Sequence, residues 1–425
     1  MLDLNLIRDN PSYVKKALKK RGVSLDEKTI LTLDEEKRQL IKVVETNKAE
    51  QNRLSKYVPI AKKKGEDVAA LFEAVNKLSA DNLVHEARLK AVDETLTAIL
   101  VELPNLPDKD LVGGGKEHNK AIKTVGTKPV FTFKPQDHVA LATSLGLIDY
   151  ERAAKISGHG TWIYTNLGAR LEWALISFFI NEHLKDGYEM MMPPYLLNEA
   201  SGFVAGQFPK FRDDVFWLNG IEPKKFLLPT AETALINLHR EEILEATSLP
   251  RKYFAYTNCF RKEAGSYGQE ERGMIRGYQF NKVELVQYTL PQDSDRAFKE
   301  LVKKAESLVN KLGLHYQVSK LAAGDISHAM ARTYDIEVFI PSMDIYKEVS
   351  SASNARDYQA RRGKIRYRDE NKKTQLVHTL NASGLATSRI FPAILEQFQQ
   401  EDGSVLIPKV LWPYLKGIKV LKPIR

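Results

Sequence analysis

The chain has 425 residues and a mass of 48.2 kDa, enough for two or three domains, and its 43% hydrophobic and 28% charged residues are ordinary for a globular protein. It contains no run of about 18 apolar residues, which argues against a membrane-spanning helix. The single cysteine, Cys259, excludes an internal disulfide and a cysteine-rich zinc site. The net charge of +9 favours a polyanionic partner. Because no secretion signal is evident, we expect a cytoplasmic protein with no membrane partner.

The first hundred residues have the period of helices. A short helical stretch is predicted over residues 1–25, and apolar residues then recur every three or four positions over 30–58 and 68–103. This heptad spacing is typical of a coiled coil, and residues 65–67 (Gly-Glu-Asp) supply a turn. We therefore predict an antiparallel helical hairpin over about 27–103.

Three residues interrupt the heptads. Pro59 is expected to kink or end the first helix near the tip of the hairpin. Asn82 and His85 fall on seam positions, where we expect them to set the register and not to bind a ligand.

Charge is divided unevenly between the two arms of this hairpin. Residues 37–64 hold nine Lys or Arg and two acids, whereas residues 66–102 hold eight acids and three bases. One interpretation is a pair of solvated helix faces that attract each other. The other is a stiff rod that binds the backbone of an RNA by charge and shape. The residues expected to contact RNA are Lys37, Arg38, Lys42, Arg53, Lys56, Lys62, Lys63 and Lys64.

The rod ends at Pro104, and the chain beyond it changes character. Residues 104–128, with three consecutive glycines from Gly113, are predicted to be a flexible linker. From 129 to 425, strand-like and helical runs are interspersed, which predicts an α+β domain with an antiparallel β-sheet flanked by helices. No GxGxxG motif follows a strand, so a dinucleotide-binding fold is not expected.

A hairpin at residues 253–286 carries the most chemistry. Two strand-like runs, 253–260 and 277–286, flank a Gly-rich charged loop. Arg261 suits a phosphate and Phe280 offers a stacking face, so a nucleotide is one possible ligand; a solvated hairpin loop is the alternative.

Further motifs decide between these alternatives. They are MMPPYL (191–196), GQFPKF (206–211), LPTAET (228–233), FRKEAGSYG (260–268), EVSSASN (348–354) and LNASGLATSR (380–389). With them the whole chain resembles the class II aminoacyl-tRNA synthetases, and among these the seryl-tRNA synthetases. The resemblance implies a class II antiparallel sheet in a homodimer, with Pro194 and its neighbours at the subunit contact. It also implies that L-serine is activated with ATP and transferred to the 3′ end of tRNA(Ser), and also of tRNA(Sec), with the hairpin rod binding the tRNA.

The resemblance assigns roles to individual residues, with Arg261 and Arg389 as the catalytic pair. Those expected to bind ATP are Arg261, Lys262, Glu263, Gly277, Phe280, Glu348, Val349, Ser350, Ser351 and Arg389. Those expected to bind serine are Thr230, Ala231, Glu232, Arg261, Glu284 and Ser383. Glu348 and Ser351 are expected to hold Mg²⁺, a hard cation that prefers oxygen ligands.

Elementary chemistry is compatible with these roles. The serine carboxylate attacks the α-phosphate of ATP in line, a step that needs positioning and charge stabilisation and no proton transfer. Arg261 is expected at the α-phosphate and the serine carboxylate, and Arg389 at the γ-phosphate. An acid within a strand, as at Glu284, is otherwise hard to justify, and it suits the serine hydroxyl, while Glu232 suits the ammonium group.

The chain departs from the family pattern at three positions. Ser388 replaces a glycine of the third motif, and Gly277 and Tyr278 stand where Val and His are usual in the second. Other readings remain: a homologue that loads a carrier protein instead of tRNA, a non-catalytic RNA-binding relative, and a coiled-coil scaffold. The complete rod argues against the first, the retained phosphate-binding residues against the second, and the second half of the chain against the third.

Overall fold

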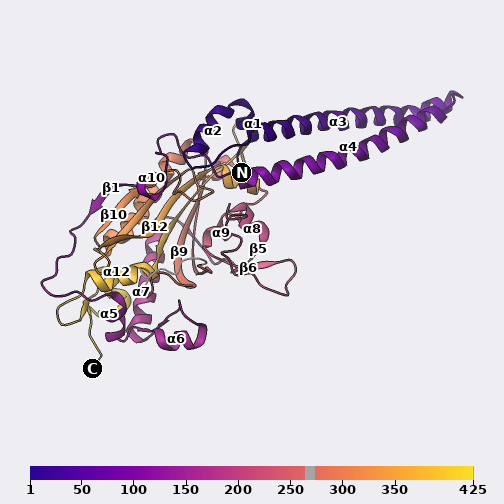
Figure 1. Cartoon of the computed structure of the whole chain (residues 1–425). Coiled ribbons are helices and arrows are strands. Elements are labelled where there is room, and N and C mark those ends of the chain that lie inside the picture. Colours follow the sequence, from indigo (N-terminus) through magenta and orange to yellow (C-terminus); the bar gives the residue numbers. More distant parts are fainter. Residues whose placement is uncertain (264–272, 425) are drawn as a thin grey trace. The chain divides into compact units, whose positions relative to one another are not determined.

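The computed structural model describes residues 1–263 and 273–424, which form two compact units (Figure 1). One unit comprises residues 2–18 and 23–103 and is called the arm unit here. The other comprises Met1, residues 19–22 and residues 104–425, and is called the catalytic unit.

The arm unit confirms the predicted helical hairpin. Two short helices, α1 (Leu4–Asp9) and α2 (Pro11–Lys19), precede the long helices α3 (Glu27–Lys63) and α4 (Ala69–Glu102). The Asp26 side chain caps the start of α3 by accepting a hydrogen bond from the Thr29 amide at 3.2 Å. After the end of α3, Gly65, with φ +77°, turns the chain toward α4. The two long helices run side by side (Figure 1), so each buries its apolar seam against the other.

The seam tolerates two disruptive residues. Pro59 does not end α3, which continues four residues further, to Lys63. Proline removes one helical hydrogen bond, and α3 continues for about one further turn beyond it. Asn82 is 5% exposed within the seam, and its amide atoms have no hydrogen-bond partner among the described residues.

The catalytic unit is built on an eight-stranded sheet in the order β1-β10-β11-β12-β15-β9-β8-β4. All neighbours are antiparallel except β4 and β8, which confirms the predicted fold class. The strands are β1 (Lys120–Val125), β4 (Glu189–Met191), β8 (Arg251–Phe260), β9 (Gln279–Thr289), β10 (Tyr316–Lys320), β11 (Arg332–Ile340), β12 (Ile345–Arg356) and β15 (His378–Ala386).

Helices cover both faces of this sheet. The main core lies against α7 (Asn166–Lys185), α10 (Ser294–Lys311) and α12 (Thr387–Gln397), and a second cluster packs β8 and β9 against α8 (Glu199–Val204), α9 (Ala231–Leu235) and α11 (Tyr358–Gly363). The remaining elements are α5 (His138–Ser144), α6 (Tyr150–Ser157), β2 (Ile148–Asp149), β3 (Ile163–Tyr164), β5 (Leu196–Asn198), β6 (Lys225–Leu227), β7 (Ile243–Glu245), β13 (Arg366–Arg368), β14 (Thr374–Leu376), β16 (Val405–Leu406), β17 (Val420–Leu421) and the 3₁₀ turns η1 (Lys116–His118), η2 (Ala246–Ser248), η3 (Pro291–Asp293) and η4 (Lys409–Leu415).

The segment 104–128 differs from the flexible linker that we expected. Its residues 120–125 form β1, which pairs with β10 at the edge of the main sheet. The glycines are also ordered by backbone contacts, since the Gly114 amide donates to the Lys20 carbonyl at 3.1 Å. β1 is exposed over most of its length, so its sequence lacks the apolar alternation by which a strand is recognised.

None of the helices within the described residues combines the length and apolarity that crossing a membrane requires.

Candidate active site

The site begins with the alternation of side chains along β9. Val283 and Leu285 belong to the main core, so Lys282 and Glu284 project from the opposite face of the sheet. Glu284 lies opposite Ser383 of β15, and the register of β15 shifts between Ser383 and Ala386. This irregularity ends regular pairing beside the site, as bulges commonly do.

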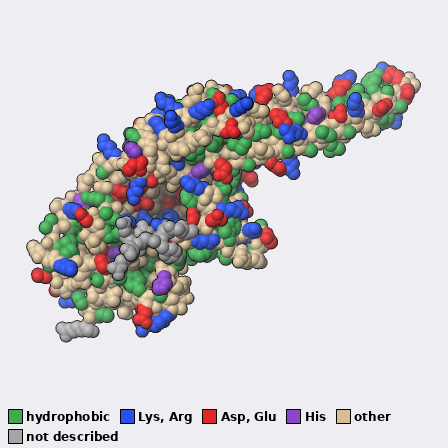
Figure 2. Space-filling view, viewed as in Figure 1, with side chains coloured by type: hydrophobic (Ala, Val, Ile, Leu, Met, Phe, Trp, Pro, Cys, Tyr) green, Lys and Arg blue, Asp and Glu red, His purple; other side chains and the backbone are tan. Residues whose placement is uncertain are grey.

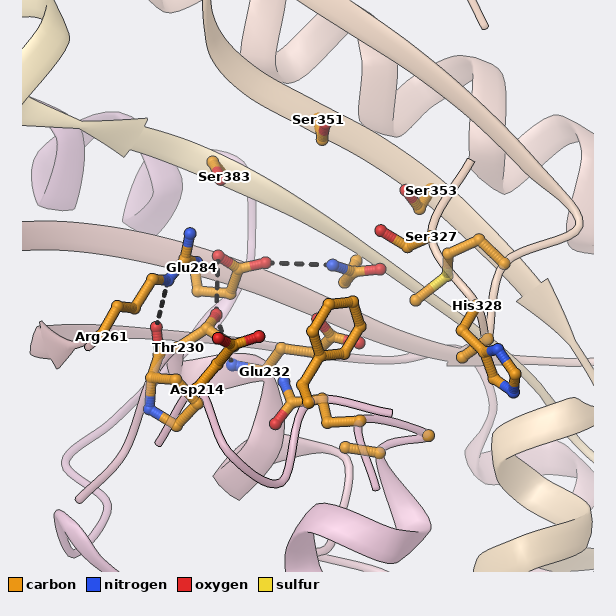
Figure 3. Close-up of a pocket in the computed structure, with 18 of the residues that line it drawn as sticks. Asp214, Thr230, Glu232, Arg261, Glu284, Ser327, His328, Ser351, Ser353 and Ser383 are labelled. Atoms are coloured by element: carbon orange, nitrogen blue, oxygen red, sulfur yellow. Dashed lines mark hydrogen bonds between the residues drawn. The ribbon is translucent and has the colours of Figure 1, made fainter. Parts of the chain in front are cut away.

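Lys282 and Glu284 line a cavity of about 450 Å³. Thr230, Glu232 and Arg261 join Glu284 at one end of it, and Ser327 and His328 lie at the other end (Figure 3). These residues come from α9 and its N-cap, from the end of β8, and from the loop between β10 and β11. Segments far apart in the sequence therefore share one concave surface.

Glu284 is held by three side chains. It is 1% exposed, and its Oε2 lies 2.7 Å from the Lys282 ammonium and 3.4 Å from the Thr230 hydroxyl. Its Oε1 accepts from the Asn381 amide at 3.2 Å. The carboxylate therefore has a defined orientation, as a buried charge requires.

Glu232 is the second buried acid of the cavity. Its Oε1 accepts from the Gln359 amide at 2.8 Å, and Thr379 in turn donates to Gln359 Oε1 at 2.6 Å. Burial and then the negative charge of Glu284 raise the pKa of Glu232 to about 7, against the opposing effect of the Gln359 hydrogen bond. This carboxylate therefore titrates near neutral pH.

The far wall of the cavity is the loop 327–330. Arg21, which follows α2, donates to the carbonyls of Ile326, Ser327 and Met330 at 2.7 to 3.0 Å. Asn105, three residues after α4, donates to the Ala329 carbonyl at 2.9 Å. Residues that adjoin the arm helices in sequence thus fix a wall of the cavity.

A smaller cavity of about 80 Å³ adjoins the first, and the two share six lining residues: Arg261, Glu263, Arg276, Lys282, Glu348 and Ser383. Arg389 lines it and donates to the Glu348 carbonyl at 2.6 Å, with the Glu348 carboxylate 3.4 Å away. The guanidinium of Arg261 lies 5.2 Å from the centre of the Phe280 ring. Basic groups and an aromatic ring therefore surround a narrow slot, as a nucleotide requires.

Most expected site residues reach one of the two cavities. Those that line at least one are Thr230, Glu232, Arg261, Glu263, Gly277, Phe280, Glu284, Glu348, Val349, Ser351, Ser383 and Arg389. Three do not. The Lys262 amide donates to the Asp214 carbonyl, Ser350 donates to the Ser383 carbonyl at 2.6 Å, and Ala231 is buried in the second core cluster.

The structure also adds residues to those expected. Lys282, Asn381 and Arg276 line the cavities, and Asp335 accepts a hydrogen bond from Ser351 across paired strands. Burial and then the charge of Glu348 raise the pKa of Asp335 well above its usual range. Alternation from Glu284 could have indicated Lys282, because residues two apart on a strand share a face.

The Gly277 departure has a steric reason. A side chain at this position would begin 2.2 Å from the Trp162 ring and 2.8 Å from the Gly160 carbonyl. Trp162 thus occupies the space in which a valine side chain would lie. The loop expected at 264–276 lies outside the described residues from Ala264 to Arg272, as do the glycines and serine of the second motif there.

Arg261 follows β8, and Arg389 lies on α12, the helix after β15. An antiparallel sheet with these two arginines is the arrangement of a class II aminoacyl-tRNA synthetase. The tRNA synthetase class II core domain (G, H, P, S and T) matches residues 216–398. The seryl-tRNA synthetase N-terminal domain matches residues 1–107. The chain belongs to the seryl-tRNA synthetase family of ATP-dependent enzymes.

Similar proteins extend over the whole chain. It is 56% identical over 416 residues to serine–tRNA ligase 2 of Clostridium acetobutylicum, covering 97% of this chain and 98% of that protein. It is 43% identical to serine–tRNA ligase of Thermodesulfovibrio yellowstonii, covering 99% and 100%. The crystal structure of seryl-tRNA synthetase from Pyrococcus horikoshii complexed with ATP has a TM-score of 0.92 at 35% identity, with both chains fully covered.

Proposed function

We propose that the larger cavity and the adjoining slot together bind L-serine and ATP, and that the protein forms seryl-adenylate and transfers serine to tRNA(Ser), and also to tRNA(Sec). The observation that carries the proposal is the junction of the two cavities, where Arg261 lines both. The structural relative from Pyrococcus horikoshii is complexed with ATP. A second relative, the cytoplasmic serine–tRNA ligase of Naegleria fowleri, is in complex with AMP. Its TM-score is 0.85 at 26% identity, and the match covers 100% of this chain and 99% of that one.

Arg261 is positioned for the first step. Its Nε donates to the Pro229 carbonyl at 3.2 Å, which anchors the side chain and leaves the terminal nitrogens for other acceptors. At the junction, these nitrogens would bind the serine carboxylate and the α-phosphate while the new C–O–P linkage forms and pyrophosphate leaves. Charge builds on phosphate oxygens during this step, so an arginine fixed in place lowers the barrier electrostatically.

Specificity for serine would come from the buried acids. Glu284 would accept the serine hydroxyl, and Glu232 would bind the ammonium group. A pocket built to hydrogen-bond a hydroxyl rejects alanine by leaving a buried polar group unpaired. Ser383, opposite Glu284 on β15, completes this end of the cavity.

The cavities also offer oxygen donors suited to Mg²⁺. Glu348 and Ser351 both line the larger cavity, and Asp335 adjoins Ser351. The described residues hold no cluster of three His, Cys, Asp or Glu that would form an all-protein cage. That fits Mg²⁺, which is usually held by one or two carboxylates together with water and phosphate. Glu348 and Ser351 would hold the ion, which would neutralise phosphate charge.

Transfer to tRNA is proposed to depend on the arm unit. Figure 2 shows Lys and Arg side chains along the arm, interspersed with acids. Three of the expected RNA contacts are paired within the arm: Lys37 with Asp93, Arg38 with Glu35, and Arg53 with Glu50. Among the residues that the structure describes, no ion pair involves Lys42, Lys56, Lys63 or Lys64. Because these side chains are exposed, they are the strongest candidates for phosphate contact.

We further propose a homodimer, in keeping with the expected role of the first motif. Met192 is 89% exposed beside β4, an edge strand of the sheet, and Met190 and Leu196 are also exposed. Exposed apolar residues at a sheet edge favour association with a second copy. Light scattering would test this, with Met192→Glu expected to weaken the dimer and the exposed Ile156→Glu, on α6, expected to leave it intact. A cytoplasmic location stays a prediction.

Amino-acid-dependent exchange of pyrophosphate into ATP tests the activity directly. Serine should support exchange, while alanine, glycine and threonine should support little. Absence of serine-dependent exchange would refute the proposal. Charging of tRNA(Ser) and tRNA(Sec) in separate assays would then establish the second step and its acceptors.

A further inference from the structure

Lys282 is a buried cation at the meeting point of the two cavities. It is 6% exposed and lines both of them. Its ammonium group lies 2.7 Å from Glu284 Oε2 and donates to the Thr230 hydroxyl at 2.8 Å. A lysine is rarely buried unless it is paired, so its charge is part of the site.

The partners of Lys282 limit what it does. Because Lys282 and Glu284 lie two residues apart on one face of β9, the ammonium reaches Glu284 Oε2 from the side, while Asn381 holds Oε1. The same positive charge lies near Glu232, where it acts against the rise in the pKa of that carboxyl.

We propose that Lys282 is a positioning residue for amino-acid recognition, which orients Glu284 toward the serine hydroxyl and offsets the charge of Glu284 beside Glu232, the acid that would bind the serine ammonium group. This inference rests on the proposed serine site. It extends that site by assigning a role to a residue that neither motif resemblance nor the chemistry of serine required.

The charges of the cavity explain why one lysine matters for two acids. Among the charges that act on Glu232, the carboxylate of Glu284 raises its pKa, and two cations, Lys282 and Arg261, lower it. Without Lys282 the two acids would share a single cation, and proton uptake would relieve their repulsion. The groups that face these acids from the surrounding elements are Thr230, Cys259, Arg261, Asn381, Ser383 and Gln359. The other charged or titratable groups that line the same cavity are Asp214, Glu263, Arg276, His328 and Glu348.

The test is the pH profile of kcat/KM for serine in the exchange assay. In Lys282→Met we expect the acidic limb to move to higher pH, because the loss of a nearby positive charge disfavours the ionised form of Glu232. The KM for serine should rise most below pH 7, whereas the KM for ATP should change little. Lys282→Arg keeps the charge and should keep the limb near its wild-type position.

A double variant separates electrostatics from packing. In Lys282→Met with Glu284→Gln, the negative charge that raises the pKa of Glu232 is also gone, so the limb should move back to lower pH. Lys252→Met, on β8 outside both cavities, is the matched control and should leave the profile unchanged.

Three outcomes would overturn the inference. These are an unshifted limb in Lys282→Met, a limb that moves in Lys282→Arg, and a double variant with the same shift as the single one. Melting temperatures would be measured alongside to show that each variant folds. If Lys282→Met does not fold, the pH profiles of Lys282→Arg and Glu284→Gln decide alone. The acidic limb must then stay in place in Lys282→Arg and move to lower pH in Glu284→Gln. Failure of the proposed function would look different, because the wild-type protein would then show no serine-dependent exchange.

Discussion

The arm of α3 and α4 and the cavity beside β9 both depend on charged side chains, but they hold them in different surroundings. On the arm, ion pairs such as Lys48–Glu86 and Arg88–Glu36 are solvent-exposed and repeat along the coiled coil. In the cavity, Lys282, Glu284 and Glu232 are buried and each has specific partners. Exposed pairs contribute up to about 1 kcal/mol, whereas breaking one buried pair costs about 3 to 5 kcal/mol.

This difference implies two ways of recognising a ligand. A rod with many exposed cations binds a long polyanion through additive contacts, so each cation matters little and the whole rod matters greatly. A buried site binds a small molecule through few contacts that have no substitute, so a single change has a large effect. The predictions below test this contrast in order of decreasing expected effect.

The largest effect should come from removing the arm. Deletion of residues 37–96, with the ends of α3 and α4 joined by a short turn, should abolish charging of tRNA(Ser), because the extended basic surface is lost. Serine-dependent exchange should persist, since both cavities lie in the catalytic unit. Exchange and charging would be measured on the same preparation. Equal loss of both activities would contradict the division of labour.

Replacing Arg261 should have an effect almost as large, but on the first reaction step, the formation of seryl-adenylate. Arg261→Met should lower kcat for serine-dependent exchange by about 10²- to 10³-fold, the usual cost of removing one group that stabilises transition-state charge. Steady-state exchange kinetics would measure this. Arg152→Met is the matched control, because Arg152 is an exposed arginine paired with Asp149 on α6. Comparable losses in the two variants would argue against a specific role for Arg261.

A moderate effect should follow from the titration of Glu232. Its pKa of about 7 is raised above the ordinary carboxyl value, so the acid is protonated below neutral pH and ionised above it. If the ionised form binds the serine ammonium group, kcat/KM for serine should rise with pH through about 7 and then level off. Glu232→Gln should lower kcat/KM and remove this limb. A limb that persists in Glu232→Gln would assign it to another group.

The smallest effect should come from one cation of the arm. Lys63→Ala, at the end of α3, should raise the KM for tRNA only about two- to threefold and reduce the salt dependence of binding by about one phosphate contact. Filter binding over a range of salt concentrations would show the slope. Lys77→Ala, on the acidic helix α4, is the control, and an equal change there would mean that the arm binds without a preferred face.

The helical hairpin and several strands were predictable because their signals are local. The seam repeats every three or four residues, so the lengths of α3 and α4 follow from the positions of apolar residues. The strand-like runs at 253–260 and 277–286 correspond to β8 (Arg251–Phe260) and β9 (Gln279–Thr289). β1 was missed, because an edge strand with exposed side chains has no apolar period.

The candidate site was predictable only in part. The motifs identified Arg261 and Arg389, because each sits in a short stretch with a recognisable spacing, and Glu284 was indicated as an acid within a strand. Asn381 was not identified, since its role depends on the pairing of β15 with β9, almost 100 residues away in the sequence. Asp335 was missed for the same reason, because only the pairing of β11 with β12 brings it to Ser351.

The sequence by itself therefore determined the family and the hairpin and indicated most residues of the candidate site, all of which are encoded in local patterns. Tertiary structure alone decided the surroundings of those residues: that Lys282 and Asn381 hold Glu284, that Glu232 titrates near neutral pH, and that Arg21 holds a wall of the cavity. The physical reason is that burial and the distance between charges depend on which distant segments the fold brings together.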